Sequence, residues 1–197
     1  MILFHDRKDM IDKKDNPFKA LKTLYTAMDQ TWNKIAADYH FLCNGCEDNC
    51  CNSLFFHHTY IEKAYLIHGF NMLDKDQKKT ILYLADIYIK KTFSKNLKIN
   101  TLKKIICPVN KNGQCLLYPY RPMICRLHGL PHELCKPGTQ VLKGPGCDAG
   151  LFDDKPYIKF DRTPFYQQMT QIEIKFRQDF NKTRKTKETI AQMLISQ

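Results

Sequence analysis

Nine cysteines in a chain of 197 residues constrain this fold more than any other feature. Four stand together over residues 43–51, three follow between residues 107 and 125, and two lie further downstream: Cys43, Cys46, Cys50, Cys51, Cys107, Cys115, Cys125, Cys135 and Cys147. Thiolates spaced by two or three residues around a turn can converge on one point, as a tetrahedral metal ion or an iron–sulfur cluster requires. The spacing therefore predicts that the two stretches meet around a metal centre.

Metal ligation is favoured over a disulfide framework because nothing in the chain points to export. The first residues turn polar after Met1-Ile2-Leu3-Phe4 and lack the apolar stretch of a secretory signal. No run approaches the roughly 18 apolar residues of a membrane helix. We therefore expect a cytoplasmic protein with no membrane partner, in which thiols stay reduced. An odd cysteine count also leaves one thiol over from complete pairing.

Apolar residues recur at three- and four-residue intervals over several segments, which predicts a mainly α fold. Helices are expected over residues 17–39, 53–70, 74–93 and 162–180, with a short one over 188–196. Strand signals are few and cover only residues 116–118 and 157–160. The predicted architecture is a set of helices around an irregular, metal-stapled, cysteine-rich centre, with few or no strands.

The expected organisation is one domain with two attached segments. Residues 1–16 read as a flexible N-terminal segment, and residues 17–180 as a single metal-binding domain with cysteine clusters at 43–51 and 107–147. Residues 181–197 read as a basic hinge and a short C-terminal helix. Residues 107–150 hold most of the proline and glycine, so we expect metal ligation and turns to shape that region.

Cys50 and Cys51 are adjacent, and this limits how the thiols can share a metal. Adjacent side chains point in different directions and do not easily ligate one ion without strain. We therefore expect two neighbouring centres or one polynuclear cluster, with Cys43, Cys46 and Cys50 in one centre and Cys51 in the other. The spacing leaves open how the downstream cysteines complete the two centres. Cys135, in a Pro/Gly loop, is the expected spare thiol.

Basic and imidazole side chains near the thiols are candidates for a supporting role. Arg121 and Arg126 flank Cys125, where guanidinium donors would favour the thiolate form and can hydrogen-bond sulfur. The alternative is a pair of ion-paired surface arginines. His128 is expected in the same outer layer around the metal, and His57 is placed on the helix that follows the first cysteine cluster.

The motifs Cys43-x2-Cys46-x3-Cys50-Cys51, Cys107-Pro108, Gly113-x-Cys115-x2-Tyr118 and Arg121-Pro122-x2-Cys125-Arg126 together resemble the YkgJ-like cysteine-cluster family, named for a CxxCxxCC motif. The resemblance covers about residues 40–150. The family is described as a zinc- or iron-chelating domain, and a flagellin lysine N-methylase contains a similar cluster. The resemblance implies that eight cysteines are ligands, namely Cys43, Cys46, Cys50, Cys51, Cys107, Cys115, Cys125 and Cys147. This chain differs by one extra residue between the second and third cysteines.

Two functions of different classes follow. In the first, the chain is an iron–sulfur protein that serves redox chemistry, with a redox partner protein, or supports a methyltransferase-like reaction. In the second, the metal is zinc, and the chain is a structural or metal-handling module without catalysis. A third function, a zinc-stapled nucleic-acid binder, draws on the formal net charge of +11. Binding eight cysteines as thiolates would lower that charge by eight to +3, so we do not expect a nucleic-acid partner.

Overall fold

The fold is known from a computed structural model, which describes residues 16–43, 49–93, 105–147 and 151–197. It is mainly α, as the sequence predicts. The helices are α1 (Phe18–Asp38), α2 (Tyr60–Asn71), α3 (Lys75–Thr92), the 3-10 turn η3 (Tyr118–Tyr120), α4 (Met123–Leu127), α5 (Thr163–Asp179) and α6 (Ile190–Ile195). Two antiparallel hairpins complete the described elements: β1 (Asn110–Lys111) with β2 (Gln114–Cys115), and β3 (His132–Cys135) with β4 (Val141–Gly144).

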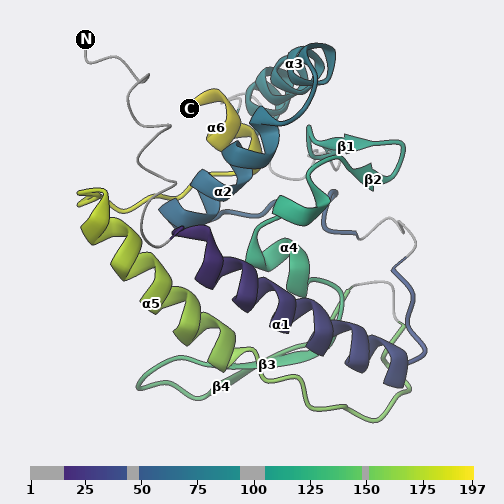
Figure 1. Ribbon diagram of the computed structural model, residues 1–197. Coiled ribbons are helices and arrows are strands. Elements are labelled where there is room, and N and C mark those ends of the chain that lie inside the picture. Colours follow the sequence, from purple (N-terminus) through teal and green to yellow (C-terminus); the bar gives the residue numbers. More distant parts are fainter. Residues whose placement is uncertain (1–15, 44–48, 94–104, 148–150) are drawn as a thin grey trace.

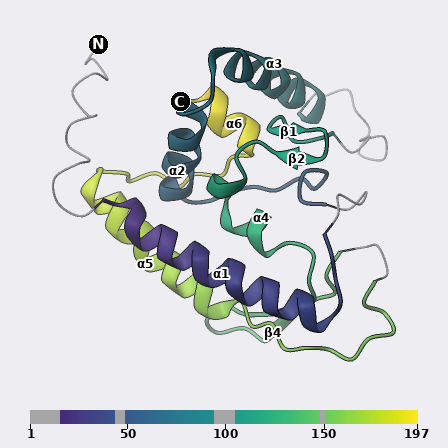
Figure 2. The ribbon, with the colours of Figure 1, turned by 45° about the vertical axis from the view of Figure 1, so that its right-hand side comes forward.

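Helix α1 forms where the periodicity predicts it. Its first turn is capped by Asn16, whose side-chain oxygen accepts the Phe18 N–H at 3.0 Å. Leu21, Leu24 and Met28 then fall on one buried face. That face packs against α4 and α5, and α1 and α5 lie side by side in both views of the ribbon (Figures 1 and 2).

The hydrophobic core is divided mainly between two clusters of buried side chains. The aromatic cluster consists of Phe18, Leu21, Leu24, Tyr25, Met28, Ile35, Ala36, Tyr39, Phe41, Ile61, Tyr65, Met123, Leu127, Leu130, Cys147, Phe152, Phe160, Met169 and Phe176. The thiol-side cluster consists of Leu66, Phe70, Ile81, Val109, Leu117, Cys125, Ile190, Met193 and Leu194. Helix α6 contributes three of the latter side chains and packs against α3, so the C-terminal helix is part of the core (Figure 1).

The predicted helix over residues 53–70 is wrong in its first third, because α2 begins only at Tyr60. Thr59 accepts the Glu62 N–H, and the Glu173 carboxylate of α5 accepts the N–H groups of Tyr60 and Ile61 at 3.0 and 3.1 Å. These acceptors satisfy the first amides of the helix and define its start. His57 is therefore in an extended segment, where it forms a β-bridge with Glu188.

The two predicted strands are also wrong. Leu116 and Leu117 form a turn and Tyr118 begins η3, while residues 157–160 lie in no strand. The strands occur instead in two hairpins within residues 107–150, a region whose shape we expected from metal ligation and turns. The sequence signal for the first hairpin is the Asn112-Gly113 pair, which is typical of two-residue hairpin loops. In the structure both residues have positive φ (53° and 84°) and form the loop between β1 and β2.

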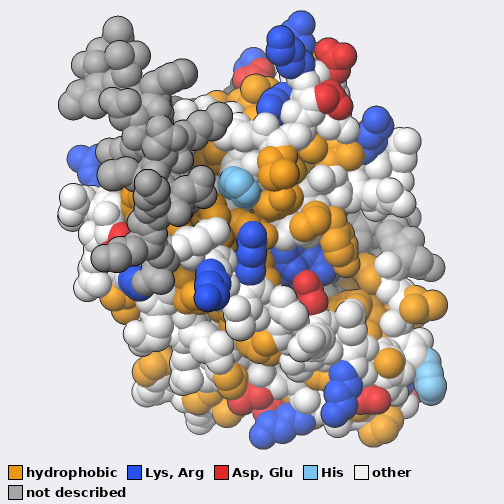
Figure 3. All heavy atoms as spheres, viewed as in Figure 1, with side chains coloured by type: hydrophobic (Ala, Val, Ile, Leu, Met, Phe, Trp, Pro, Cys, Tyr) orange, Lys and Arg blue, Asp and Glu red, His pale blue; other side chains and the backbone are white. Residues whose placement is uncertain are grey.

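Among the described helices, none is both long and apolar enough to cross a membrane. On the face shown in Figure 3, lysine and arginine side chains are spread among acidic and hydrophobic ones.

Candidate metal centre

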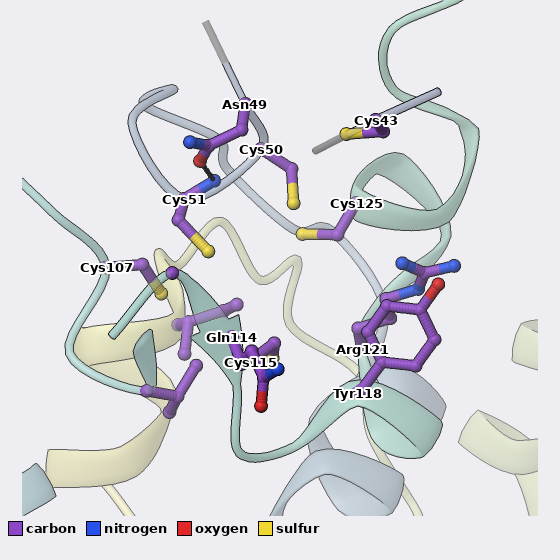
Figure 4. Close-up of a pocket in the computed structure, with 13 residues that line it drawn as sticks. Cys43, Asn49, Cys50, Cys51, Cys107, Gln114, Cys115, Tyr118, Arg121 and Cys125 are labelled. Atoms are coloured by element: carbon purple, nitrogen blue, oxygen red, sulfur yellow. Dashed lines mark hydrogen bonds between the residues drawn. The ribbon is translucent and has the colours of Figure 1, made fainter. Parts of the chain in front are cut away.

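Six cysteines from two distant stretches of the chain line one pocket of about 420 Å³. They are Cys43, Cys50, Cys51, Cys107, Cys115 and Cys125. Figure 4 shows the side chains of Cys50, Cys51, Cys107 and Cys125 turned into this space. Cys50, Cys51, Cys107, Cys115 and Cys125 are thiols and not disulfides. Cys46 lies outside the described residues. The meeting of the two stretches, which the spacing predicts, is thus confirmed for these six residues.

Backbone hydrogen bonds hold the two stretches against each other at Cys51 and Cys107. The Cys107 N–H donates to the Cys51 carbonyl at 2.8 Å. The Cys51 N–H donates to the side-chain oxygen of Asn49, also at 2.8 Å (Figure 4). Both amides of this contact are therefore satisfied within the protein, and the position of Cys51 relative to Cys107 is set by the backbone.

The β1–β2 hairpin brings Cys107 and Cys115 to the same wall of the pocket. Asn110 pairs with Cys115, and the Asn110 N–H donates to the Cys107 carbonyl at 3.0 Å. The Leu116 N–H closes the far end of the hairpin by donating to the Val109 carbonyl at 2.9 Å. Each strand of the hairpin is only two residues long. The turn and these flanking hydrogen bonds therefore fix the positions of Cys107 and Cys115.

Hydrogen-bond donors are directed at the sulfurs of this wall. Burial raises the pKa of Cys107, while the N–H of Val109 donates to its sulfur and lowers the pKa. Burial also raises the pKa of Cys115, to about 11, although the Leu117 N–H donates to the Cys115 sulfur and lowers the pKa. In both cases the donor is the amide two residues downstream. Amides aimed at sulfur stabilise the thiolate, which is the form that binds metal.

The pKa of Cys51 is lowered from its usual value. The largest cause is a hydrogen bond that the Cys50 thiol donates to the Cys51 sulfur. Burial acts in the opposite direction and raises the pKa of Cys51. A hydrogen bond from the Asn110 side chain and the charge of Arg121 lower it further. The hydrogen bond between the two cysteines raises the pKa of Cys50. Burial raises the pKa of Cys125 well above its usual value. A metal ion would have to displace the protons of the neutral thiols when it binds.

Arg121 supplies positive charge to the pocket wall. Its guanidinium lies 3.8 Å from the centre of the Tyr118 ring and 3.3 Å from a carboxylate oxygen of Asp29. The other oxygen of Asp29 binds Arg126 at 2.5 Å. One carboxylate thus serves two guanidinium groups, which leaves a net positive charge beside the thiols. The charge of Arg121 lowers the pKa values of the cysteines around it.

Arg126 is buried and lies outside the residues that line the pocket. It donates to the carbonyls of Arg121 and Pro119 at 3.0 and 2.5 Å, and it packs 4.0 Å from the centre of the Tyr25 ring on α1. Its contacts connect α4, which carries Cys125, to α1 and to the turn before α4. Arg126 therefore positions α4, and with it Cys125, relative to α1. Arg121 is the arginine that lines the thiol pocket.

The structure places three other predicted residues away from the pocket. His128 packs edge-on against Phe55, with the ring centres 5.4 Å apart, and does not line the pocket. Cys147 is buried in the aromatic cluster, where its N–H donates to the Gly129 carbonyl at 3.1 Å. Cys135 is exposed at the end of β3.

Sequence reasoning did not single out Asp29, Asn49 or Asn110, although all three support the site. Asn110 begins the Asn110-Lys111-Asn112-Gly113 hairpin signal between two cysteines, and this pattern could have indicated its role. Asp29 lies on α1, far away in sequence, and carries no local signal.

In the part of the chain that the structure describes, no three histidine, cysteine, aspartate or glutamate side chains are grouped so that they could hold a metal ion. The thiols are distributed over the pocket walls. The predicted metal-stapled centre therefore remains a prediction.

Comparisons with protein-family models, with curated proteins and with solved structures give no match. The resemblance to the YkgJ-like cysteine-cluster family accordingly stays a prediction from the motifs alone.

Proposed function

We propose that this chain is a cysteine-ligated metal protein that holds an iron–sulfur cluster in the thiol-lined pocket. The observation that carries the proposal is the combination of six cysteines around one pocket with hydrogen-bond donors aimed at their sulfurs. Cysteines buried only as small hydrophobes need no such donors. Amide and guanidinium groups beside sulfur are instead what an anionic metal–thiolate centre requires.

The size of the pocket favours a polynuclear cluster over a single zinc ion. Four thiolates bound to one zinc ion lie about 3.8 Å from one another, because each Zn–S bond is about 2.3 Å long. Such a centre encloses no free space. Here the sulfurs surround a pocket of about 420 Å³, which can accommodate the iron and sulfide atoms of a cluster between them.

The charges in the pocket fit an anionic group. A cluster bound by four thiolates carries net negative charge, and the guanidinium of Arg121 lies on the wall that would face it. Hydrogen bonds from Val109, Leu117 and Asn110 would reach its thiolate ligands. Such donors stabilise the more negative, reduced state and raise the reduction potential.

When bound, the cluster would supply one-electron redox chemistry, or support for a reaction such as methyl transfer. The residues of the chain would hold it, balance its charge and exclude water from its buried side. The function then implies a redox partner protein and a reducing compartment such as the cytoplasm, in which the thiols remain free to bind metal.

The test is to purify the full chain without oxygen, reconstitute it with ferrous iron and sulfide, and measure iron, acid-labile sulfide, zinc and visible absorption. We expect stoichiometric iron and sulfide and a broad visible band. A colourless protein that binds zinc in preference to iron would contradict the cluster and support the zinc module. A protein that binds neither would overturn metal binding altogether.

The matched variants are Cys125→Ala and Cys147→Ala. Both remove a buried cysteine of similar exposure, 8% and 6%, but only Cys125 lines the pocket. We expect Cys125→Ala to lose at least about tenfold in metal affinity. Cys147→Ala should keep the metal and lose only stability. Equal loss of metal in both variants would show that the pocket is not the site.

A further inference from the structure

The β3–β4 hairpin has one covered edge and one open edge. The segment that leads into α5 covers the β3 edge, where Asp161 forms a parallel bridge with Glu133. Among the described residues no strand lies beside the outer edge of β4. In Figure 1 the hairpin lies at the bottom of the molecule, below α1 and α5. We propose that β4 is a docking edge for an extended, acidic segment of a partner protein, which adds a strand to the hairpin.

The hydrogen bonds of β3 show which backbone groups of the hairpin point outward. The Glu133 N–H donates to the Phe160 carbonyl, and the Glu133 carbonyl accepts the Arg162 N–H, both at 2.9 Å. The Cys135 N–H donates to the Thr163 hydroxyl at 2.9 Å. These groups point away from β4. Glu133 and Cys135 therefore occupy the ladder positions that exchange no hydrogen bonds with the neighbouring strand.

The β4 residues at these ladder positions are Lys143, which pairs with Glu133, and Val141, which pairs with Cys135. The two residues of such a pair direct their N–H and C=O groups to opposite edges of the hairpin. Val141 and Lys143 therefore present two N–H and two C=O groups along the open edge. No hydrogen bond from the described part of the chain reaches them there. This alternating row of backbone groups is what an added strand pairs with.

The side chains of β4 give the open edge an apolar character. Val141 is 50% exposed and Leu142 is 51% exposed. Successive side chains of a strand point to opposite faces, so one apolar residue lies on each face of the hairpin. A strand added to β4 would partly cover both. An apolar residue placed opposite Leu142 would contact it directly, as cross-strand neighbours do.

A cleft of about 350 Å³ opens at the Gly144 end of the strand. Lys143 and Lys155 line this cleft together with one carboxylate, that of Asp153, and the ring of Tyr157. None of the ion pairs formed among the described residues involves either lysine. Two ammonium groups thus outnumber the carboxylate at the end of the open edge. An acidic side chain of the partner segment complements this charge.

The positions of the leucine and the cleft set the spacing of the partner's residues. Gly144 is two residues beyond Leu142, so the two positions lie on the same face of the strand. Gly144 has no side chain, and the ring of His132 fills the space that a Cβ would take. A partner residue opposite Gly144 would therefore lie beside the cleft, while the residue opposite Leu142 covers the leucine. The segment accordingly carries an acidic and an apolar residue two positions apart.

A second copy of this chain fits the edge less well than an acidic partner. Antiparallel pairing of β4 with itself would place both Lys143 side chains on the same face of the sheet, where their charges repel. The strand is only four residues long. A contact of this length is far smaller than the roughly 800 Å² per partner of a stable interface, and suits a transient peptide partner.

The experiment measures the binding of two fluorescent peptides to the full chain by fluorescence anisotropy. Both peptides alternate threonine and valine around a central leucine. The first has an aspartate two positions to each side of the leucine, which serves either strand direction, and the second has asparagine at both places. We expect saturable binding of the aspartate peptide and at least about threefold weaker binding of the asparagine peptide.

Hydrogen exchange read by NMR reports where the peptide binds. The amides of Val141 and Lys143 should gain protection when the aspartate peptide is added at saturation, because they point to the open edge. The amide of Leu142 points toward β3 and should change less.

Three variants test the edge and the cleft separately. Val141→Pro removes an outward N–H, and proline is tolerated on an edge strand where the nitrogen faces solvent, so the hairpin should persist. We expect this variant to bind both peptides at least about tenfold more weakly. Lys143→Met should weaken the aspartate peptide by about threefold to tenfold and leave the asparagine peptide unchanged. Lys159→Met is the matched control, an exposed lysine outside the cleft, and should bind as the natural chain does.

Thermal unfolding of each variant verifies that it is folded, and if Val141→Pro is not, Lys143→Met and the exchange pattern decide. A natural chain that binds neither peptide saturably would overturn the inference. Unchanged binding by folded Val141→Pro, or equal losses in Lys143→Met and Lys159→Met, would do the same. A dimer in sedimentation that Val141→Pro abolishes would assign the edge to a second copy instead. All these measurements are made without added metal, so their failure leaves the proposed function of the thiol pocket untouched.

Discussion

The two hydrophobic clusters of this protein use buried cysteine in opposite ways. Cys147 is one small side chain in the aromatic cluster, to which the long helices α1 and α5 both contribute buried side chains. Cys125 is equally buried but belongs to the thiol-side cluster, and it faces a pocket that five other cysteines also line. The first cluster is complete without a ligand. The second borders a pocket lined by thiols, and we expect its stability to depend on what fills that pocket.

The largest expected effect is a difference in local stability when the proposed metal binds. Amides of residues 105–125 and of α6 should gain protection from hydrogen exchange by at least about tenfold on metal loading, because the short β1–β2 hairpin and its flanking turns have little else to order them. Amides of α1 and α5 should change little. Hydrogen-exchange mass spectrometry of metal-loaded and metal-free protein tests this contrast, and uniform protection of both regions would contradict it.

The next effect concerns His57, which lines a small cavity beside Cys107 and Cys125. Burial lowers its pKa from 6.5 to about 4. As the pH falls from about 6.5 to about 4, the unfolded chain takes up a proton at this site and the folded chain does not, so stability falls over that window. The shift corresponds to about 3 kcal/mol at most.

Denaturant unfolding of the metal-free protein at pH 7 and pH 4 measures this contribution. The natural chain should lose up to about 3 kcal/mol more than His57→Leu between the two pH values. The exposed neighbour His58 is the matched control, and His58→Leu should keep the pH dependence of the natural chain. The same pH dependence in His57→Leu would show that this imidazole is not the cause.

A smaller effect is expected at Asp29, which connects the two regions. Its carboxylate binds Arg121 on the pocket wall and the buried Arg126 behind it. Asp29→Asn would leave the Arg126 guanidinium buried without a counter-charge, at a cost of about 2 kcal/mol once the one-third exposure of Asp29 is taken into account. Chemical denaturation gives the value, with exposed Asp38→Asn on the same helix as control. A change within about 0.5 kcal/mol would indicate that the pair is screened by water.

The smallest effect is expected at Cys135, the exposed cysteine at the end of β3. Cys135→Ala should change the free energy of unfolding by no more than about 0.5 kcal/mol and leave metal content unchanged. Thermal unfolding and elemental analysis are sufficient to check this. Loss of metal would place a ligand outside the pocket described above.

Local pattern was sufficient for the long helices and for part of the site. Asn16 and the apolar stripe of α1, and Asp74 at the start of α3, are signals within the helix itself, so both helices begin where predicted. The start of α2 was misplaced because its first amides bind Glu173, more than a hundred residues away. The hairpins were missed because ladders of two to four residues are shorter than the alternation by which strands are identified.

Sequence alone determined that cysteines from two distant stretches would come together, because their spacing and number leave few other arrangements. Only the tertiary structure decided which of them do. Cys125 and Cys147 are both followed by polar residues in turn-rich segments, but α4 directs the first toward the pocket and the turn at Gly146 buries the second among aromatic rings. The same holds for charge, since the pairing of Arg121 and Arg126 with a single carboxylate depends on how α1 packs against α4. Spacing along the chain records which residues can meet, whereas the packing of helices sets the direction in which each side chain points.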